Sequence, residues 1–591
     1  MHRQNWRLEG AVADLLLRRT TNECPFGQIV VVRQVPSRNG VLAKGADIPT
    51  PTNKMKQQSM SLFGIRQFIR GLAACCLVAG PTVFGAAIGV TDNGTTIVVD
   101  THAGLVYTVK KSSGDVTSIK WNGTELNDQS KASQISSGLG SATVTWSLSP
   151  SGATVVITIA TSTLTHYISS RNADPTMYMA TWISAEPSVG ELRWITRLKG
   201  TVLTGVPAPS NNSGNTGAIE STDVFGHSNG QTTSKYYGNQ QAKDLTIRGV
   251  TGSSVGVFMC YGNRESSSGG PFFRDIQNQS DTSADSELYN YMNSGHNQTE
   301  SDRVNVLNGP YALVFTTGGT PAIPDMSWMS GLNLKGWVSG RGTVHGTASG
   351  LDSGTTGMVG FANSTAQYWA NVSGGSYTCS SMKPGSYTAT LYQGELGVAT
   401  ASASVTSGGN TTLNLSSALS HPTTIWKIGT WDGSPKEFLN GGNISQMHPS
   451  DVRNSSWGPK TFSVGSSVSG FPSVQFRGDN SPTTITFNLT SGQVAAHMLR
   501  IGITCAYNNG RPSVSVNGHA LTNPGASSQP NSRSITIGTY RGNNTTFTYS
   551  VPAADFVSGA NSLTITPISG SSDLSAWLSA SFAYDCIELD N

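Results

Sequence analysis

Two arginines in the segment GELRWITRLKG have the spacing of a binding pair. Arg193 and Arg197 are four residues apart, and on a β-strand this spacing places both side chains on one face. The opposite face then carries Leu192, Trp194 and Leu198. Guanidinium groups bind carboxylates through two parallel hydrogen bonds, so this face suits an acidic ligand. Spacing alone favours the simpler alternative, a solvated sheet edge on which Glu191 forms a salt bridge.

A lysine in the segment TTSKYYGNQQAKD is a candidate base. Lys235 precedes two tyrosines, and a lysine beside aromatic residues usually lies at the surface with its stem packed on the rings. It acts as a base only where its amine loses the proton, which nearby cations such as Arg193 and Arg197 would favour. Unless these residues converge in the fold, a surface lysine is the better interpretation.

The segment YNYMNSGHNQTES combines two tyrosines with a lone histidine. Tyr289 and Tyr291 share a strand face, as sugar-stacking residues would, although core tyrosines do so more often. His296 follows a Ser-Gly turn and precedes the Asn-x-Thr sequon of Asn297. It is either an acid or base in a carbohydrate cleft or a loop histidine on a glycosylated surface.

Other polar segments discriminate less. The stretch NRESSSGGPFFRDI must form a loop, which either contacts a substrate or is purely structural. It lacks the lysine and the glycine spacing of nucleotide-binding loops, so we reject nucleotide binding. A glycoside hydrolase needs two carboxylates, and too many pairs can be drawn from Glu220, Asp223, Glu265, Asp275 and Glu300.

Composition and strand patterns indicate an all-β protein of several domains. The chain has 591 residues, 12% charged residues, 67 glycines and a net charge of +3, which excludes a coiled coil and gives no basic groove for nucleic acid. Short alternating segments separated by Gly/Pro/Ser turns predict three consecutive β-domains. We place them at 87–333, 334–421 and 422–591.

The N-terminal region predicts secretion. Residues 60–86 carry two arginines, a short apolar stretch and small residues, as a signal peptide does. A translation start at Met60 then leaves 1–59 as a gene-model extension or a disordered segment; the alternative for 60–86 is a signal anchor or buried apolar segment. Sequons recur downstream, at Asn93, Asn122, Asn278, Asn297, Asn371, Asn454 and Asn488 among others.

The later cysteines do not form a disulfide scaffold. Cys260, Cys379, Cys505 and Cys586 are widely spaced and show no metal-binding pattern. A bridge from Cys505 to Cys586 is an alternative that the sequence leaves open.

Taken together, the segments resemble a known family. SGLGSATVT, MATWISAEPSVGELRWITRL, AIESTDVFG, ESSSGGPFFRDI, YMNSGHNQTES, GRGTVHGTASG, KIGTWDGSP, SSWGP and GRPSVSVN, in this order, are similar to fungal rhamnogalacturonan lyases of polysaccharide lyase family four. The resemblance covers essentially all of 87–591. It implies a mutarotase-like catalytic β-sandwich, a fibronectin-III-like domain and a jelly-roll domain resembling a carbohydrate-binding module.

The resemblance also implies a reaction and roles for named residues. The substrate would be pectic rhamnogalacturonan I, cleaved by β-elimination at the rhamnose-α-1,4-galacturonate bond to leave a 4,5-unsaturated galacturonate. Lys235 and His296 would be the catalytic pair, with Lys235 as the base and His296 as the acid or stabiliser. Four residues would bind the substrate: Arg193, Arg197, Tyr289 and Tyr291. No cofactor is expected in catalysis, because the arginines can stabilise the charge that many lyases stabilise with Ca²⁺. A structural Ca²⁺ in the C-terminal domain stays open.

Two departures from the family pattern stand out. The chain reads SSGDVT at Ser112–Thr117 where the family has SSCDIT, and a partner cysteine is missing around Thr158 to Ala160; we expect this lost disulfide to affect stability only. The chain also reads GGPFFRD for GGPFHRD, so Phe273 removes a polar contact that a subsite could use.

The function therefore has three candidates: a secreted monomeric lyase, a glycoside hydrolase with a carboxylate pair, and a non-catalytic pectin-binding protein. Only the lyase creates a new double bond with ultraviolet absorbance. We expect neither nucleic acid nor membrane as a partner. A glycan on Asn297 would crowd the cleft, so we predict that Asn297 is unmodified.

Overall fold

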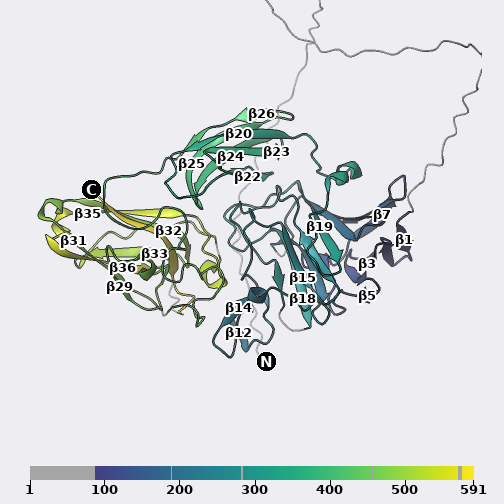
Figure 1. The fold of residues 1–591 in the computed structure, drawn as a ribbon, viewed down its shortest axis with the longest axis horizontal. Coiled ribbons are helices and arrows are strands. Elements are labelled where there is room, and N and C mark those ends of the chain that lie inside the picture. The colour runs from purple at the N-terminus through teal and green to yellow at the C-terminus, as the bar shows by residue number, and fades with distance from the viewer. Residues whose placement is uncertain (1–86, 188–189, 281–283, 456, 531, 570–575) are drawn as a thin grey trace, which may run out of the picture. The chain divides into compact units, whose positions relative to one another are not determined.

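The computed structural model describes residues 87–187, 190–280, 284–455, 457–530, 532–569 and 576–591. The predicted extension (1–59) and signal peptide (60–86) lie outside these described residues. Nearly all regular structure in the described ranges is β-strand, joined by turns and short 3-10 helices (Figure 1). The predicted all-β fold class is confirmed.

The N-terminal region contains two large antiparallel sheets. The five-stranded sheet follows chain order: β1 (Gly89–Asp92), β2 (Thr96–Asp100), β3 (Leu105–Lys110), β4 (Val116–Trp121) and β5 (Thr124–Glu125). The seven-stranded sheet has the order β15 (Ile247–Thr251), β16 (Gly256–Cys260), β19 (Val306–Thr316), β10 (Thr176–Ile183), β9 (Leu164–Arg171), β8 (Thr154–Ala160) and β7 (Thr143–Leu148).

Two smaller sheets of the same region carry the candidate site. The four-stranded sheet has the order β17 (Asn278–Gln279), β18 (Asp285–Asn293), β11 (Leu192–Lys199) and β6 (Gln134–Ile135). The three-stranded sheet consists of β12 (Gly217–Glu220), β13 (Val224–Gly226) and β14 (Thr232–Ser234). The 3-10 helices of the region are η1 (Ala208–Ser210) and η2 (Ser327–Leu332). Strands β10 and β11, which the sequence joins by a Pro/Gly turn, belong to different sheets.

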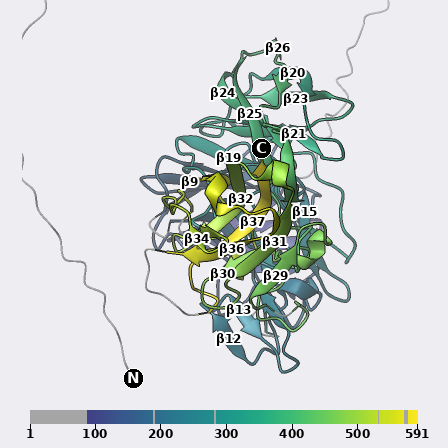
Figure 2. The ribbon, with the colours of Figure 1, turned by 90° about the vertical axis from the view of Figure 1, so that its left-hand side faces the viewer.

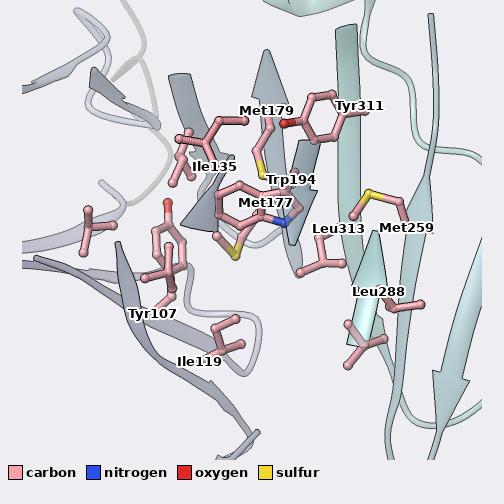
Figure 3. Close-up of a cluster of buried hydrophobic side chains, with 14 of the residues drawn as sticks. Tyr107, Ile119, Ile135, Met177, Met179, Trp194, Met259, Leu288, Tyr311 and Leu313 are labelled. Carbon is pink, nitrogen blue, oxygen red and sulfur yellow. The ribbon is translucent and has the colours of Figure 1, made fainter. Parts of the chain in front are cut away.

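A large apolar core fixes the orientation of β11. Trp194 is fully buried, together with Leu192 and Leu198, and Figure 3 shows its ring beside Met177 and Met179. Burying a side chain of this size contributes roughly 2–3 kcal/mol. Because strand side chains alternate, this burial turns the intervening arginines to the other face, as predicted.

The middle and C-terminal regions each consist of two sheets. In the middle region, one sheet contains β23 (Ser376–Met382), β20 (Gly342–Ser349), β26 (Asn410–Thr412) and β27 (Leu415–Ser416), and the other β22 (Gln367–Asn371), β21 (Gly357–Ala362), β24 (Gly385–Gln393) and β25 (Leu396–Val405). Each region has its own hydrophobic cluster, as packed β-sandwiches do.

Figure 2 shows the C-terminal strands toward the viewer. One sheet contains β28 (Thr424–Gly429), β37 (Ser581–Asp590), β32 (His497–Tyr507), β35 (Thr545–Val551) and β30 (Val474–Phe476). The other contains β29 (Lys460–Ser463), β31 (Thr483–Leu489), β36 (Gly559–Ile568), β33 (Arg511–Val516) and β34 (His519–Ala520). Four 3-10 helices connect them: η3 (Val468–Gly470), η4 (Ser491–Gln493), η5 (Ser534–Ile537) and η6 (Ala553–Asp555).

The structure bears on the Cys505–Cys586 bridge that the sequence left open and on the disulfide missing at Gly114. Cys505 and Cys586 are buried free thiols, so the bridge left open between them does not form: Cys505 pairs in register with Ala583, not with Cys586. Gly114, where the family has a cysteine, lies against Ile159, because a Cβ built on Gly114 would be 2.3 Å from the Ile159 Cγ2 atom. Gly114 thus contacts Ile159, which lies in the segment Thr158 to Ala160 where the resemblance places the partner cysteine.

Candidate functional site

Strand pairing brings four predicted residues onto one face. Strands β11 and β18 run antiparallel, with Arg193 opposite Tyr291 and Ile195 opposite Tyr289. The two tyrosine rings stack with their centroids 5.7 Å apart. The Arg193 Nη1 group donates a hydrogen bond to the Tyr291 hydroxyl, and its guanidinium lies 5.3 Å from the centre of that ring. The predicted shared faces of both strands are confirmed.

His296 lies beyond the end of β18 and joins this face. Its ring contacts Tyr291 and Tyr236, at centroid distances of 5.9 and 5.4 Å. Its Nδ1 atom is 3.2 Å from both carboxylate oxygens of Asp275, and its Nε2 atom is 3.3 Å from Oε1 of Glu191. A carboxylate at each nitrogen favours the imidazolium form, in which both nitrogens can donate.

The charge of His296 results from two opposing effects. Burial lowers the pKa of His296, but the negative charges of Asp275, Glu191 and Asp223, with the hydrogen bond that His296 donates to Asp275, outweigh burial and raise it above its usual value. The site therefore keeps this histidine protonated to a higher pH than free histidine.

Glu191 connects His296 to the arginine face. Its Oε2 atom is 2.5 Å from Nη1 of Arg193, while its Oε1 atom faces His296. One carboxylate thus receives two cationic donors, as the carboxylate of a bound uronate would. The sequence left open a carboxylate-binding face and a surface salt bridge; the structure shows Glu191 paired with Arg193 and places His296 beside the same carboxylate.

Arg197 has a different partner. Its Nε group donates to Oε1 of Glu287 at 3.0 Å, and the Tyr289 hydroxyl donates to the same carboxylate. Glu287 is buried, and burial together with the charge of Glu287 holds the pKa of Tyr289 well above its usual value. The two arginines share a strand face, but Arg193 pairs with Glu191, whereas Arg197 pairs with the more deeply buried Glu287.

Lys235 follows β14 at the edge of the small sheet. Its Nζ atom is 3.7 Å from Oδ1 of Asp223, and its backbone N–H donates to the Asp223 carbonyl. The next residue, Tyr236, packs its ring on His296, so Lys235 and His296 lie next to the same tyrosine. Asp223 as a direct partner of Lys235 was not expected, since the sequence suggested arginines as its neighbours.

The carboxylates considered for a hydrolase are all engaged. Glu220 and Asp223 bind Arg533, Glu265 binds Arg341 and Lys383, Asp275 binds His296, and Glu300 binds Arg303. Against the effect of burial, these partners hold the pKa of Glu220 and of Glu265 below its usual value, which disfavours the protonated acid that a glycosidase needs.

The serines of the loop NRESSSGGPFFRDI have structural roles, while Asp275 of the same loop contacts His296. Ser266, Ser267 and Ser268 are buried; Ser266 accepts a hydrogen bond from Lys383, and Ser268 donates to Asn293. Phe273 is also buried and packs against Gly269. Phe273 is therefore not open to substrate, whereas the sequence analysis had associated this position with a subsite.

Sequence reasoning missed the roles of Asp275, Glu287 and Arg533. Asp275 reaches His296 from a loop 21 residues earlier, and Arg533 comes from the C-terminal region; no local pattern signals either contact. Glu287 had a weak signal, because it lies two residues before Tyr289 on the same strand face.

The residues that the structure describes contain no group of three or more His, Cys, Asp or Glu side chains arranged to hold a metal ion. No helix within the described ranges combines the length and apolar character of a membrane span.

Comparison with known proteins identifies the family. Residues 88–336 match the family model described as rhamnogalacturonan lyase B, N-terminal, and residues 340–413 and 424–589 match domains II and III of polysaccharide lyase family 4. Rhamnogalacturonate lyase A of Aspergillus aculeatus is 46% identical over 514 residues, covering 85% of this chain and 96% of the relative. The chain belongs to polysaccharide lyase family 4.

Other comparisons agree with this family membership or add nothing to it. Rhamnogalacturonate lyase A of Emericella nidulans is 46% identical over 516 residues, which cover 86% of this chain and 97% of the relative. Among solved structures, a Paenibacillus xanthan lyase matches with a TM-score of 0.19 at 12% identity, covering 85% of this chain and 52% of that chain. A score this low supports no argument about this family 4 member.

Proposed function

We propose that the protein is a secreted endo-acting lyase that cleaves the rhamnose-α-1,4-galacturonate bond of rhamnogalacturonan I by β-elimination. The names of its relatives support the substrate. The observation that carries the proposal is the meeting of Arg193 and His296 at one carboxylate, Glu191. A site built to hold Glu191 in this way has the donors that a uronate carboxylate needs.

The chemistry follows from the charges of the site. A base removes the C5 proton of galacturonate, and the electron pair passes through an enolate-like carboxylate to form the C4–C5 double bond. The C4–O4 bond breaks, and O4 takes up a proton. Arg193 and the imidazolium of His296 stabilise the negative charge that builds on the carboxylate.

Lys235 is assigned as the base and His296 as the acid or stabiliser. A base must be unprotonated and an acid protonated at the working pH. The raised pKa of His296 suits the second role. Tyr291 contacts His296 and stacks on Tyr289. Both tyrosines are buried, at 3% and 5% exposed, so we assign them to supporting the site from the core side.

Secretion and metal content are further parts of the proposal. The signal-like segment at 60–86 supports export. Arg193 supplies positive charge at the site, so no cofactor is assigned to catalysis. A structural Ca²⁺ in the C-terminal region would be detected by metal analysis of purified protein.

Lys235→Ala tests the proposal. Rhamnogalacturonan I is incubated with each variant, and both ultraviolet absorbance and new reducing ends are measured. The wild type should generate both signals, and Lys235→Ala should lose at least about a hundredfold in rate. Lys111→Ala is a matched control, because Lys111 pairs with Asp92 at the surface of the five-stranded sheet.

Each result has a distinct reading. Reducing ends without absorbance from the wild type would indicate a hydrolase, and pectin binding without either signal would indicate a non-catalytic protein. Full elimination activity in Lys235→Ala would remove Lys235 as the base.

A further inference from the structure

We propose that Arg533, from the C-terminal region, is a positioning residue for Lys235, so that this region completes the active site. The inference rests on the proposed role of Lys235 as a base. Arg533 immediately precedes η5 and binds two acidic residues of the N-terminal region. Its Nη1 atom is 2.8 Å from Oε1 of Glu220, and its Nη2 atom is 2.5 Å from Oδ2 of Asp223. The other oxygen of Asp223 faces the amine of Lys235.

The contact between Arg533 and Glu220 is part of a larger buried cluster. Glu220 also accepts hydrogen bonds from the hydroxyl of Thr536 at 2.7 Å and from His448, whose Nε2 atom is 3.0 Å away. Burial raises the pKa of Glu220, but the hydrogen bonds from His448 and Thr536 and the charge of Arg533 bring it below its usual value. A carboxylate with this many partners is ionised and fixed in place.

A second contact holds the other end of the same small sheet. Asp451 accepts hydrogen bonds from the backbone N–H and the hydroxyl of Thr232, at 2.6 and 3.0 Å. Arg453 donates to the Thr232 carbonyl at 3.0 Å. Thr232 begins β14, the strand that leads to Lys235. Residues 448–453 and 533–536 therefore clamp the sheet β12–β13–β14 at two places.

The apolar neighbours of the site make the same connection. Ile537, at the end of η5, belongs to a buried cluster with Tyr236, Tyr289, Tyr291 and Ile195. Through Ile537, the C-terminal region thus packs with Tyr236, Tyr289 and Tyr291. It also contacts β14, the strand that precedes Lys235. A docking surface that only tethered a carbohydrate-binding domain would need neither contact.

The charges give Arg533 a specific effect on the base. Arg533 neutralises Asp223 and repels a second cation, so its removal leaves an unpaired negative charge of Asp223 beside the Lys235 amine. Charged groups nearby include Glu220, which binds Arg533 and His448. His296 with its partners Asp275 and Glu191 lies beyond Tyr236.

The experiment compares Arg533→Gln with Asp223→Asn. If Lys235 is the base, kcat/KM rises with pH as its amine loses the proton. Arg533→Gln should move this rising limb upward by about one pH unit, with about tenfold less activity on the limb and recovery at higher pH. Asp223→Asn should move the limb downward. Arg533→Lys should recover part of the shift, and Arg511→Gln, which alters another arginine of the C-terminal region, should leave the limb in place.

A second measurement reads the amine without turnover. Competitive labelling of Lys235 with an amine reagent, followed by peptide mass analysis across pH, should show the same opposite shifts. If Arg533→Gln lowers the rate at every pH but shifts neither the rising limb nor the labelling curve, Arg533 has only a structural role and the proposal is overturned. A variant whose rate and labelling curves both match the wild type would overturn it as well. If the wild type lacks elimination activity, the proposed function fails, while the labelling curves still decide the role of Arg533.

Discussion

The imidazole of His296 lies with its Nδ1 atom 3.2 Å from both carboxylate oxygens of Asp275. Asp275 raises the pKa of His296 against the effect of burial. A raised histidine pKa means that the imidazolium persists at higher pH, and that an acid function is lost as the pH rises through this value.

Asp275→Asn should therefore move the falling limb of the activity profile to lower pH, by about one to two units. The rising limb, assigned to Lys235, should stay in place. Titration of the His296 ring protons by NMR provides a direct check on the folded variant. An unchanged histidine titration would show that Asp275 does not set the charge of His296.

Glu191→Gln should strengthen the binding of acidic ligands. The Glu191 carboxylate occupies the donors of Arg193 and His296, and an entering uronate must compete with it. Removing its charge should tighten the binding of an unsaturated rhamnogalacturonan oligosaccharide about three- to tenfold, or up to ~1.4 kcal/mol. Calorimetric titration measures this change. Weaker binding would mean that Glu191 orients the two cations rather than competing for them.

Arg197→Ala should cost stability more than substrate affinity. The mutation leaves the buried carboxylate of Glu287 without its closest cation, which should lower the free energy of unfolding by about 3 kcal/mol. Denaturant unfolding tests this value, and Arg197→Ala combined with Glu287→Gln should recover part of the loss. Lys131→Ala is the control, because Lys131 is 49% exposed and 3.9 Å from Glu287, and its removal should change little. A large rise in KM with unchanged stability would instead support a binding role.

Glycosylation should follow the exposure of the sequons. Asn93, Asn122, Asn371 and Asn488 are exposed, whereas Asn278 and Asn297 are 0% and 5% exposed. A glycan fits only on an asparagine that reaches solvent. Glycopeptide analysis of protein secreted from a fungal host should find glycans at exposed sequons and none at the two buried ones. High occupancy at Asn297 in active enzyme would contradict the site geometry.

The place of the missing disulfide should accept a new one. In Gly114→Cys with Ile159→Cys, the two side chains start in contact. A bridge should contribute about 2–4 kcal/mol, reduced by about 1 kcal/mol because residue 114 has a positive φ of 79°. Thermal unfolding with and without reductant measures the net gain, and Ile159→Cys alone is the control. Equal melting temperatures in both conditions would show that the bridge does not form.

Local alternation predicted much of the site, and contacts between distant segments supplied the rest. The period of two residues was enough to place Arg193 beside Arg197 and Tyr289 beside Tyr291, because Trp194 had to be buried. It could not reveal that Arg197 is occupied by Glu287, since that depends on the register between β11 and β18. The partner of His296 lies in a loop, and the loop pattern of NRESSSGGPFFRDI said nothing about which side chain would emerge from it.

The clamp on the small sheet also sets an order of events during synthesis. Arg533 lies 310 residues after Asp223 in the chain, and domains fold as they leave the ribosome, N-terminal parts first. The strands that lead to Lys235 therefore emerge long before the residues that hold them. If Arg533 positions Lys235 as proposed, a growing or truncated chain contains Lys235 but lacks Arg533. The enzyme would gain full activity only at the end of translation, when nearly the whole polypeptide has been made.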